Sequence, residues 1–383
     1  MHLAVLTAFH YPDGGPAATR HLALASGLVA AGHQVTFVLL HQAEVPPDLT
    51  GQPGVGWRSV APAQIRSAVG WRLAAIRRLR SCLEQVAIAL PLDAVMVADR
   101  DPILMRAGIA AAKALGIVAL HELTEYPEIM PHHGLLRTFE VKAFDHLLGR
   151  LDGVLVVSTA LEHYVAERAS TPTRLLGPLV DADAEPALPH LDLASTLVVG
   201  YAGSLSQSKD GVLDLLRASA LAAQQLPRGM DLRIEILGPV DGTDGQAAQL
   251  EALRLRRADR VVFHGRVPRA QVRAHLAGCH VLVLPRPASR QATGGLPTKL
   301  GEYLATARPV VTTAVGDIPR YMADNDTCLM VPPSDLAALT QALVAVASDY
   351  PGAQLIGARA GRSSSAPSRR LSKLPRSSPS SST

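Results

Sequence analysis

Two kinds of segment alternate along this chain, and their order restricts the possible folds more than any other feature. Short runs rich in Val, Ile and Leu, such as residues 3–7 and 34–40, are separated by longer alanine-rich stretches such as residues 17–31. The short runs predict buried strands, and the longer stretches predict helices. Repeated strand–helix–strand units predict a parallel sheet with helices on both faces.

The alternation stops once and then restarts, which predicts two domains. Before the break, further strands are predicted at residues 94–98, 117–120, 154–158 and 174–176. After the break, strands are predicted at residues 197–201, 232–237, 260–263, 281–284 and 309–312. The break, residues 181–195, is rich in Pro, Asp and Ala, as linkers are. We therefore predict an α/β fold with two Rossmann-like parallel-sheet domains, residues 1–180 and 196–350, that face each other across a cleft.

The positive charge of the chain is concentrated at its end. The formal net charge is +4, but residues 361–383 hold five Lys and Arg, ten Ser and no acid. Without them, 32 Lys and Arg face 33 Asp and Glu. We predict a low-complexity, disordered Ser/Arg tail over residues 351–383. A reading-frame change in the coding DNA is an alternative hypothesis for the tail. The neutral body, with 4 % aromatic residues, argues against a nucleic-acid partner.

Targeting and cysteine signals favour the cytoplasm. The first residues lack a basic n-region, and no apolar run reaches the roughly 20 residues that a membrane helix needs. The three cysteines, Cys82, Cys279 and Cys328, are too far apart for a disulfide framework or a Cys-x-x-Cys metal site. We expect a cytoplasmic protein, with the inner face of the membrane as an alternative place of action.

A basic stretch lies in the first predicted domain. Residues 57–83 contain six arginines and no acid, and leucines at helical spacing lie among Arg72, Arg77, Arg78 and Arg80. This pattern is typical of a basic amphipathic helix that makes peripheral contact with an anionic membrane or a lipid diphosphate acceptor. It fits equally well a helix with a solvated basic face.

Three loops carry residues suited to binding phosphate. Gly14 and Gly15 follow the first strand, where backbone N–H groups at a helix N-terminus can bind an anion. Lys209 lies in a similar loop of the second domain. Each of these two, taken alone, fits an ordinary loop better. In residues 294–316, a glycine pair precedes a helix that carries Lys299 and Glu302 on one face. Lys299 can bind a diphosphate, and Glu302 can accept hydrogen bonds from a ribose.

The loops together resemble one enzyme family. The stretch PTKLGEYLATARPVVTT resembles the donor-site signature of retaining GT-B glycosyltransferases of family 4, also called group 1. Three other segments of the family occur in the same order along this chain. The family's first glycine loop resembles YPDGGPAATRHLALASGLVAAGHQVTFV, its diphosphate-lysine loop resembles YAGSLSQSKDG, and its base-binding segment resembles VVFHGRVPRAQVRAHLAGCHVLVLP. The resemblance covers roughly residues 1–360, and several motifs in order are stronger than one.

The resemblance implies roles for particular residues. Lys209 and Lys299 would hold the donor diphosphate, Glu302 would bind the ribose, and His121 would be the active-site histidine near the donor sugar. The donor would also be approached by Gly14, Gly15, Gly294, Gly295 and Leu296. The chain departs from the family at Gly294, where a glutamate is usual, and at Ser204, where an arginine is usual. Both departures affect which donor sugar is expected, and neither affects the predicted fold.

The resemblance also implies an activity. A sugar would pass from a UDP- or GDP-sugar, bound by the second domain, to a glycan or lipid-linked acceptor, bound by the first, with retention and without metal or other cofactor. Polysaccharide or cell-envelope synthesis is the expected context. A catalytically silent GT-B partner subunit and a GT-B nucleotide-sugar epimerase are alternatives. A bilobal solute-binding protein is a third, weakened by the lack of a signal peptide.

Overall fold

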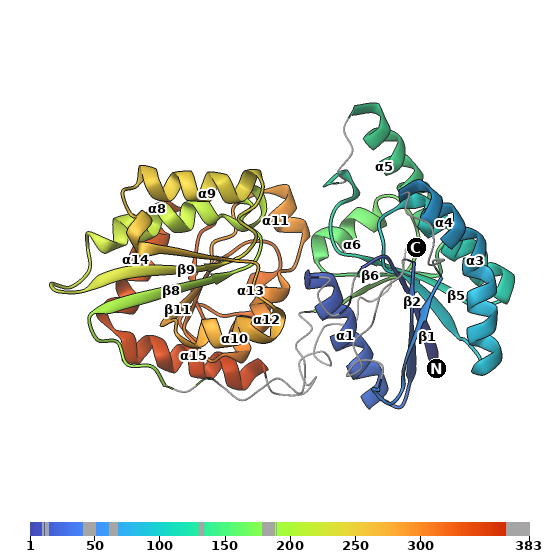
Figure 1. The fold of residues 1–383 in the computed structure, drawn as a ribbon, viewed down its shortest axis with the longest axis horizontal. Helices are drawn as coiled ribbons and strands as arrows, with labels where there is room; N and C mark the ends of the chain where they lie inside the picture. Colours follow the sequence, from blue (N-terminus) through green and yellow to red (C-terminus); the bar gives the residue numbers. More distant parts are fainter. Residues whose placement is uncertain are drawn as a thin grey trace, which may run out of the picture.

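The chain folds into two α/β domains that lie side by side (Figure 1). This arrangement comes from a computed structural model, which describes residues 1–9, 11, 15–40, 51–60, 68–129, 134–177, 188 and 190–364. The first domain carries a seven-stranded sheet and the second a six-stranded sheet, and all strand pairs within them are parallel. The predicted pair of parallel-sheet domains is therefore confirmed.

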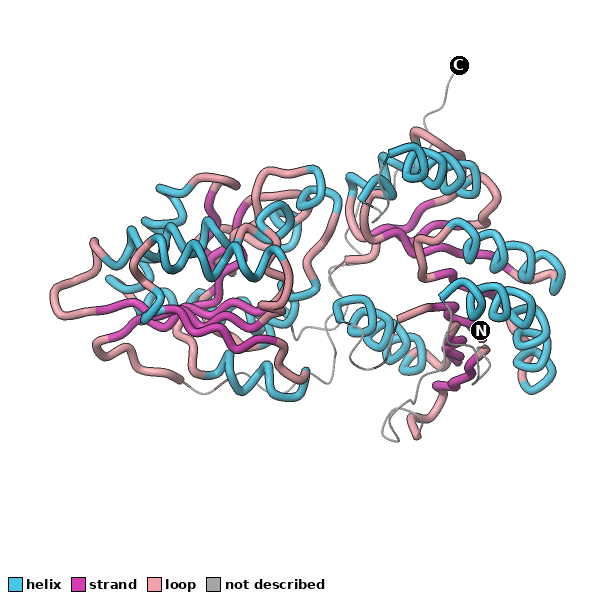
Figure 2. The backbone as a smooth tube through the Cα atoms, turned by 45° about the horizontal axis from the view of Figure 1, so that its top comes forward, coloured by secondary structure: helices cyan, strands magenta, loops and turns pink. Residues whose placement is uncertain are grey.

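The N-terminal sheet has the strand order β3-β2-β1-β4-β5-β6-β7. Its strands are β1 (His2–Thr7), β2 (Gln34–Leu39), β3 (Val55–Ser59), β4 (Ala94–Val97), β5 (Val118–Leu123), β6 (Gly153–Val156) and β7 (Thr173–Leu175). Its helices are α1 (Gly15–Ala30), α3 (Ala68–Ala89), α4 (Pro102–Leu115), η1 (Pro127–Ile129), α5 (Gly134–Leu148) and α6 (Thr159–Ala166). Every residue of β1 and β4 is buried, because helices cover both faces of the sheet (Figure 2).

The C-terminal sheet has the strand order β10-β9-β8-β11-β12-β13. Its strands are β8 (Thr196–Ala202), β9 (Asp231–Leu237), β10 (Val261–Gly265), β11 (Val281–Leu284), β12 (Val310–Thr313) and β13 (Leu329–Val331). Its helices are α7 (Gln207–Asp210), α8 (Val212–Ala223), α9 (Thr243–Arg254), η2 (Ala258–Arg260), α10 (Arg269–Ala277), α11 (Arg290–Gly294), α12 (Thr298–Ala305), α13 (Ile318–Tyr321), α14 (Leu336–Ser348) and α15 (Tyr350–Ser364). The strand order reverses between β8 and β11, the point where such sheets bind ligands.

The structure corrects the predicted secondary structure in four places. Strands β3 and β13 were missed. The edge strand β3, VGWRS, lacks an apolar run, and the edge strand β13, LMV, is only three residues long. Strand β5 continues to Leu123, beyond the predicted end at residue 120. The tail boundary at residue 351 was wrong, since α15 extends to Ser364 and buries Ala353 and Ala360. Residues 365–383 and most of the predicted linker lie outside the described residues.

The basic helix α3 uses its apolar side inside the protein. Leu79 and Leu83 are buried in the core of the N-terminal domain, whereas Arg77, Arg78 and Arg80 are exposed. These leucines are therefore not available to a membrane, and the predicted contact through the arginines stays a prediction. The side chain of Arg72 lies outside the described residues. None of the helices in the described part of the chain has the length and apolarity that a membrane crossing requires.

The two domains touch through hydrogen bonds and a close aromatic contact. Ser158 Oγ, at the start of α6, donates to the carbonyl oxygen of Gly294 at 2.6 Å. The backbone N–H of Thr159 donates to Asp317 at 2.8 Å. Tyr126, from the first domain, packs so closely on Gly294 that a Cβ there would lie 2.5 Å from Tyr126 Cε2. Only a residue without a side chain fits position 294 at this boundary.

A buried polar network joins α1 to β5. Glu122 accepts hydrogen bonds from Arg20 at 2.5 and 3.0 Å, and its carboxylate lies 2.7 Å from the Nε2 atom of His21. His21 Nδ1 lies 2.7 Å from the hydroxyl of Tyr11. Burial raises the pKa of Glu122, but the charge of Arg20 and the hydrogen bond with His21 outweigh that effect and hold the pKa well below its usual range. The network therefore joins the second turn of α1 to β5.

Glu122→Gln is expected to destabilise the N-terminal domain by about 3–5 kcal/mol, because it leaves the buried Arg20 without a charge partner. The loss should be full above the unfolded pKa of about 4.3 and should shrink as the pH falls below that value, since Glu122 is then protonated in the unfolded chain. Urea unfolding at several pH values measures both effects. Glu84→Gln, which breaks the exposed pair with Arg80, is the control and should change stability by less than about 1 kcal/mol.

Gly294→Ala is expected to separate the domains, because the added Cβ clashes with the ring of Tyr126. Spin labels at two exposed sites on opposite domains, Ile88→Cys on α3 and Leu250→Cys on α9, would report a longer distance.

The double variant Tyr126→Ala/Gly294→Ala should return the distance to its original value. Gly278→Ala is the matched control, since its Cβ would meet only one neighbouring atom, at 3.6 Å. An unchanged distance in Gly294→Ala would show that Tyr126 does not limit position 294.

Candidate active site

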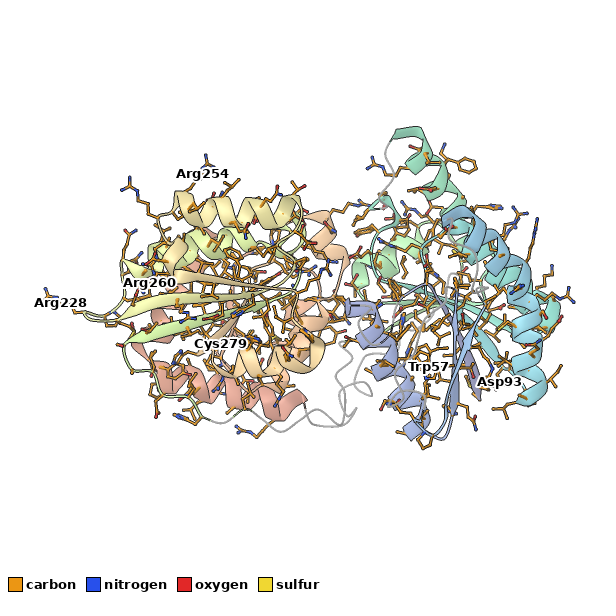
Figure 3. All side chains as sticks on the ribbon, viewed as in Figure 1. Trp57, Asp93, Arg228, Arg254, Arg260 and Cys279 are labelled. Atoms are coloured by element: carbon orange, nitrogen blue, oxygen red, sulfur yellow. The ribbon has the colours of Figure 1, made fainter. Side chains whose placement is uncertain are left out.

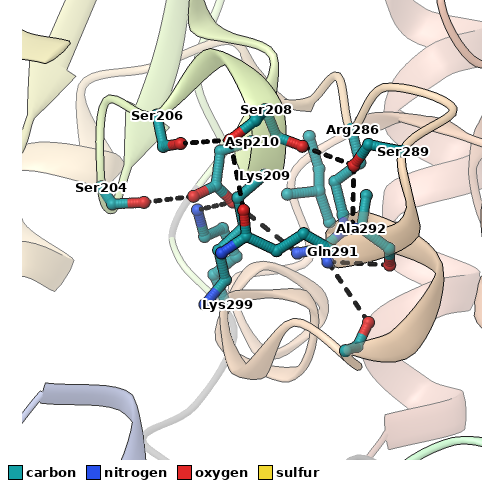
Figure 4. A network of polar contacts seen from close by, with 12 residues as sticks. Ser204, Ser206, Ser208, Lys209, Asp210, Arg286, Ser289, Gln291, Ala292 and Lys299 are labelled. Carbon is teal, nitrogen blue, oxygen red and sulfur yellow. Dashed lines mark hydrogen bonds and ion pairs between the residues drawn. The ribbon is translucent and has the colours of Figure 1, made fainter. Parts of the chain in front are cut away.

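The candidate site lies where the carboxyl ends of the C-terminal strands meet the first domain. Strand β8 leads into α7, which carries Lys209, and β11 leads into the loop that holds α11 and the start of α12. Figure 4 shows these segments in contact, with α7 tied to α11 by the hydrogen bond that Ser289 Oγ donates to the carbonyl of Ser208 at 2.5 Å. The carboxyl edge of a parallel sheet is the usual ligand-binding edge.

Asp210 is the centre of the first charged group. Its carboxylate is almost fully buried and lies 2.8 Å from Lys299 Nζ and 3.7 Å from Arg286 Nη1. Ser204 Oγ donates a hydrogen bond to its other oxygen. Burial raises the pKa of Asp210, but Lys299, Ser204 and Arg286 together outweigh that effect, so the pKa lies below its usual value. We call Lys299, Asp210 and Arg286 the inner triad.

Lys299 has little freedom within the inner triad. Its side chain is only 12 % exposed, and its ammonium donates to the Tyr201 hydroxyl at 2.9 Å as well as to Asp210. Burial lowers the pKa of Lys299, and Asp210 opposes that shift. A Cβ at Gly203 would lie 2.3 Å from Lys299 Nζ, so the glycine at this position makes room for the ammonium.

Arg286 holds the loop of residues 294–297, which we call the glycine loop. The side chain is 1 % exposed, and its Nη2 donates to the carbonyls of Ala292 at 2.9 Å and Gly295 at 3.3 Å. Its Nε has no hydrogen-bond partner among the described residues. Burial lowers the pKa of Arg286, and Asp210 opposes the shift. The loop that precedes α12 is therefore held by the same arginine that contacts Asp210.

The second charged group crosses the domain boundary. Glu125, from the first domain, pairs with Lys209 of the second domain and with Arg100 of its own domain, the latter at 3.0 Å. Burial raises the pKa of Glu125, but Lys209, Arg100 and Arg286 together outweigh that effect and lower the pKa overall. Lys209 is 32 % exposed, which leaves it more accessible than Lys299. We call Arg100, Glu125 and Lys209 the bridging triad.

The two triads together form a positively charged region. Each places one carboxylate between two cations, so each has a net charge of +1, and Lys209 and Asp210 are adjacent in α7. Other cations of the domain, such as Arg228 and Arg254, point outward at a distance from the boundary (Figure 3). A net positive region at a strand edge suits an anionic ligand with two charges. No group of three or more His, Cys, Asp or Glu residues suited to a metal exists within the described ranges.

The remaining predicted donor residues lie in different environments. Glu302 is exposed on α12 and makes no hydrogen bond or ion pair within the described part of the chain. Leu296 packs against the core of the first domain, which brings the glycine loop to the boundary. Gly15 begins α1 with a φ of +68°, a conformation that favours glycine. Gly14 lies outside the described residues.

His121 differs from its predicted placement. It lies within β5 rather than after it, its side chain is fully buried, and its ring packs on Phe144 with centroids 5.3 Å apart. Burial lowers the pKa of His121 to about 4, although Glu122 opposes the shift. Successive strand residues point to opposite faces, so Glu122 points toward α1 and His121 toward α5. The structure does not bring the His121 ring to the two lysines.

Sequence reasoning missed Asp210, Arg286 and Tyr201 and gave Glu125 no role. Arg286 lies two residues after Leu284, the last residue of β11, so the rule that ligands bind at carboxyl strand ends could have found it. Asp210 could have been suspected as the neighbour of Lys209, whereas its pairing with Lys299 depends on tertiary contacts. The link between Glu125 and Lys209 joins residues 84 positions apart and has no sequence signal.

Family comparisons agree with this architecture. The family model described as Glycosyl transferases group 1 matches residues 196–349, and the one described as Glycosyltransferase Family 4 matches residues 17–184. No curated protein matches the chain by sequence. The Family 4 match ends within the predicted linker and the group 1 match begins directly after it, so each domain is matched by one of the models.

Several solved glycosyltransferase structures have the same fold. Sucrose-phosphate synthase from Thermosynechococcus elongatus superposes with a TM-score of 0.74 at 18 % identity, covering 96 % of this chain and 94 % of that one. Anabaena HepE, in complex with UDP and glucose, gives 0.71 at 16 % identity, with 95 % of each chain covered. WaaG, a glycosyltransferase involved in lipopolysaccharide biosynthesis, gives 0.66 at 16 % identity, again with 95 % of each chain covered. With two parallel-sheet domains, two glycosyltransferase family matches and these structural neighbours, the chain belongs to the group 1 glycosyltransferases of GT-B fold.

Proposed function

We propose that the protein transfers a sugar from a nucleoside diphosphate sugar, a UDP- or GDP-sugar, to a glycan or lipid-linked acceptor with retention of anomeric configuration. The observation that carries the proposal is the pair of triads at the strand edge, with a net charge of +2. Glu302 follows Lys299 by one turn of α12 and has no partner among the described residues. A diphosphate fits the triads, and a ribose offers two hydroxyl groups to the Glu302 carboxylate. HepE, a structural neighbour, binds UDP-glucose, which supports the same class of donor here.

Lys209 is the cation best placed to reach the diphosphate, because it is the more exposed of the two lysines. Lys299 would act mainly by holding Asp210 and adding its charge to the site. In the transfer, the bond between the anomeric carbon and the phosphate oxygen breaks while a bond to the acceptor oxygen forms. The acceptor proton passes to the departing phosphate oxygen. Fixed cations would stabilise the charge of that leaving group without a metal.

The glycine loop and His121 are proposed to line the sugar. The main chain of Gly295 and Leu296 would approach it from the second domain. A contact from His121 would come from its backbone, since its ring is enclosed. Closure of the domains around the donor would exclude water and so favour transfer over hydrolysis. Action at the inner face of a membrane, in polysaccharide or cell-envelope synthesis, is part of the same proposal.

Lys209→Met is expected to weaken the binding of UDP or GDP about 10- to 100-fold, because it removes a charged contact to the diphosphate. The same variant should weaken the binding of inorganic pyrophosphate, which has no base or ribose. Calorimetric titration measures both constants. Lys113→Met, on α4 of the first domain, is a matched control and should bind both ligands as the wild type does.

Glu302→Ala should weaken the nucleoside diphosphate about tenfold while leaving pyrophosphate unchanged, because Glu302 is proposed to contact only the ribose. Equal losses for both ligands would place Glu302 at the phosphates instead. A product assay with and without acceptor then separates transfer from epimerisation or mere binding. If no nucleoside diphosphate binds the wild type, the proposed function is wrong.

A further inference from the structure

Glu125 occupies an unusual place for an acid. It enters a region that is otherwise suited to anions, and it does so from the opposite domain. Its side chain is 18 % exposed, and both of its carboxylate oxygens are used, one by Lys209 and the other by Arg100. It stands directly before Tyr126, the residue that closes on Gly294. The pairing of Glu125 with Lys209 is therefore part of the contact between the domains.

A diphosphate and Glu125 would compete for the same ammonium. Two anions held beside one cation repel each other, and this repulsion is strong where solvent is partly excluded. The inner triad cannot relieve it, because Lys299 and Arg286 already share Asp210. Arg100 offers Glu125 an alternative partner within its own domain at 3.0 Å. Glu125 can therefore separate from Lys209 and still keep one cationic partner.

From these contacts, and on the basis of the proposed function, we propose that Glu125 sets the affinity of the donor site. In the donor-free protein it neutralises Lys209 and holds the domains together. When a diphosphate binds, Glu125 gives up Lys209 and stays paired with Arg100. Glu125 is a positioning residue in this scheme, since it acts on the donor through Lys209.

Glu125→Gln tests the competition, because it removes the charge and keeps the size of the side chain. We expect pyrophosphate and UDP to bind about three- to tenfold more tightly than to the wild type, since no carboxylate has to be displaced. The gain should disappear in Glu125→Gln/Lys209→Met when compared with Lys209→Met alone. A merely structural Glu125 would give unchanged or weaker binding, and either result would overturn the proposal.

Glu128→Gln is the matched control. Glu128 lies in η1 of the same domain and also pairs across the boundary, with Arg290 at 3.2 Å, but Arg290 belongs to neither triad. Its loss should leave pyrophosphate binding unchanged within about twofold. A gain in affinity equal to that of Glu125→Gln would contradict a specific role for Glu125.

The role of the Glu125–Lys209 pair in holding the domains together is tested separately, without any ligand. With the labels at Ile88→Cys and Leu250→Cys, Glu125→Gln should shift the distances between the domains to longer values in the donor-free protein. Distances identical to those of the wild type would show that the Glu125–Lys209 pair does not hold the domains together. If the wild type bound neither UDP nor pyrophosphate, the proposed function would fail, while the label distances would still decide whether Glu125 joins the domains. Thermal unfolding of each variant confirms that the fold is retained.

Discussion

Neutralisation of charge at the edge of the C-terminal sheet is the constraint on which the rest of the site depends. Asp210 is almost fully buried, and a buried carboxylate is stable only when cations and hydrogen bonds surround it. Lys299, Arg286 and Ser204 meet that requirement, and each comes from a different segment. The loop after β8, the loop after β11 and the start of α12 are thereby fixed relative to one another.

Glycines provide the space for these contacts. Gly203 makes room for the Lys299 ammonium, and a Cβ at Gly211 would lie 1.9 Å from the carbonyl oxygen of Pro285. Gly294 allows Tyr126 to close on the glycine loop from the other domain. The missing glutamate at position 294 therefore has a physical reason in this protein. An aromatic ring of the first domain occupies the place where that side chain would lie.

The sequence predicted the fold well because its pattern is local. Parallel strands buried on both faces, such as β1 and β4, require continuous apolar runs, and those runs are visible without any tertiary information. The edge strand β13 is apolar but only three residues long, and it was missed. Residues 351–364 were assigned to the tail because Ala353, Gly357 and Ala360 are small, and only the contacts of α15 with α12 and α14 show that they belong to a packed helix.

By itself, the sequence determined that this chain forms two parallel-sheet domains and carries the residues of a group 1 glycosyltransferase at their strand ends. Only the tertiary structure decided how those residues are used. It buries the His121 ring and pairs Lys299 with Asp210. It leaves Lys209 and Glu302 more accessible to solvent than Lys299. It also joins Glu125 to Lys209 across the boundary. Sequence spacing governs which residues share a helix or strand, whereas the sharing of charge between distant segments depends on how the domains pack.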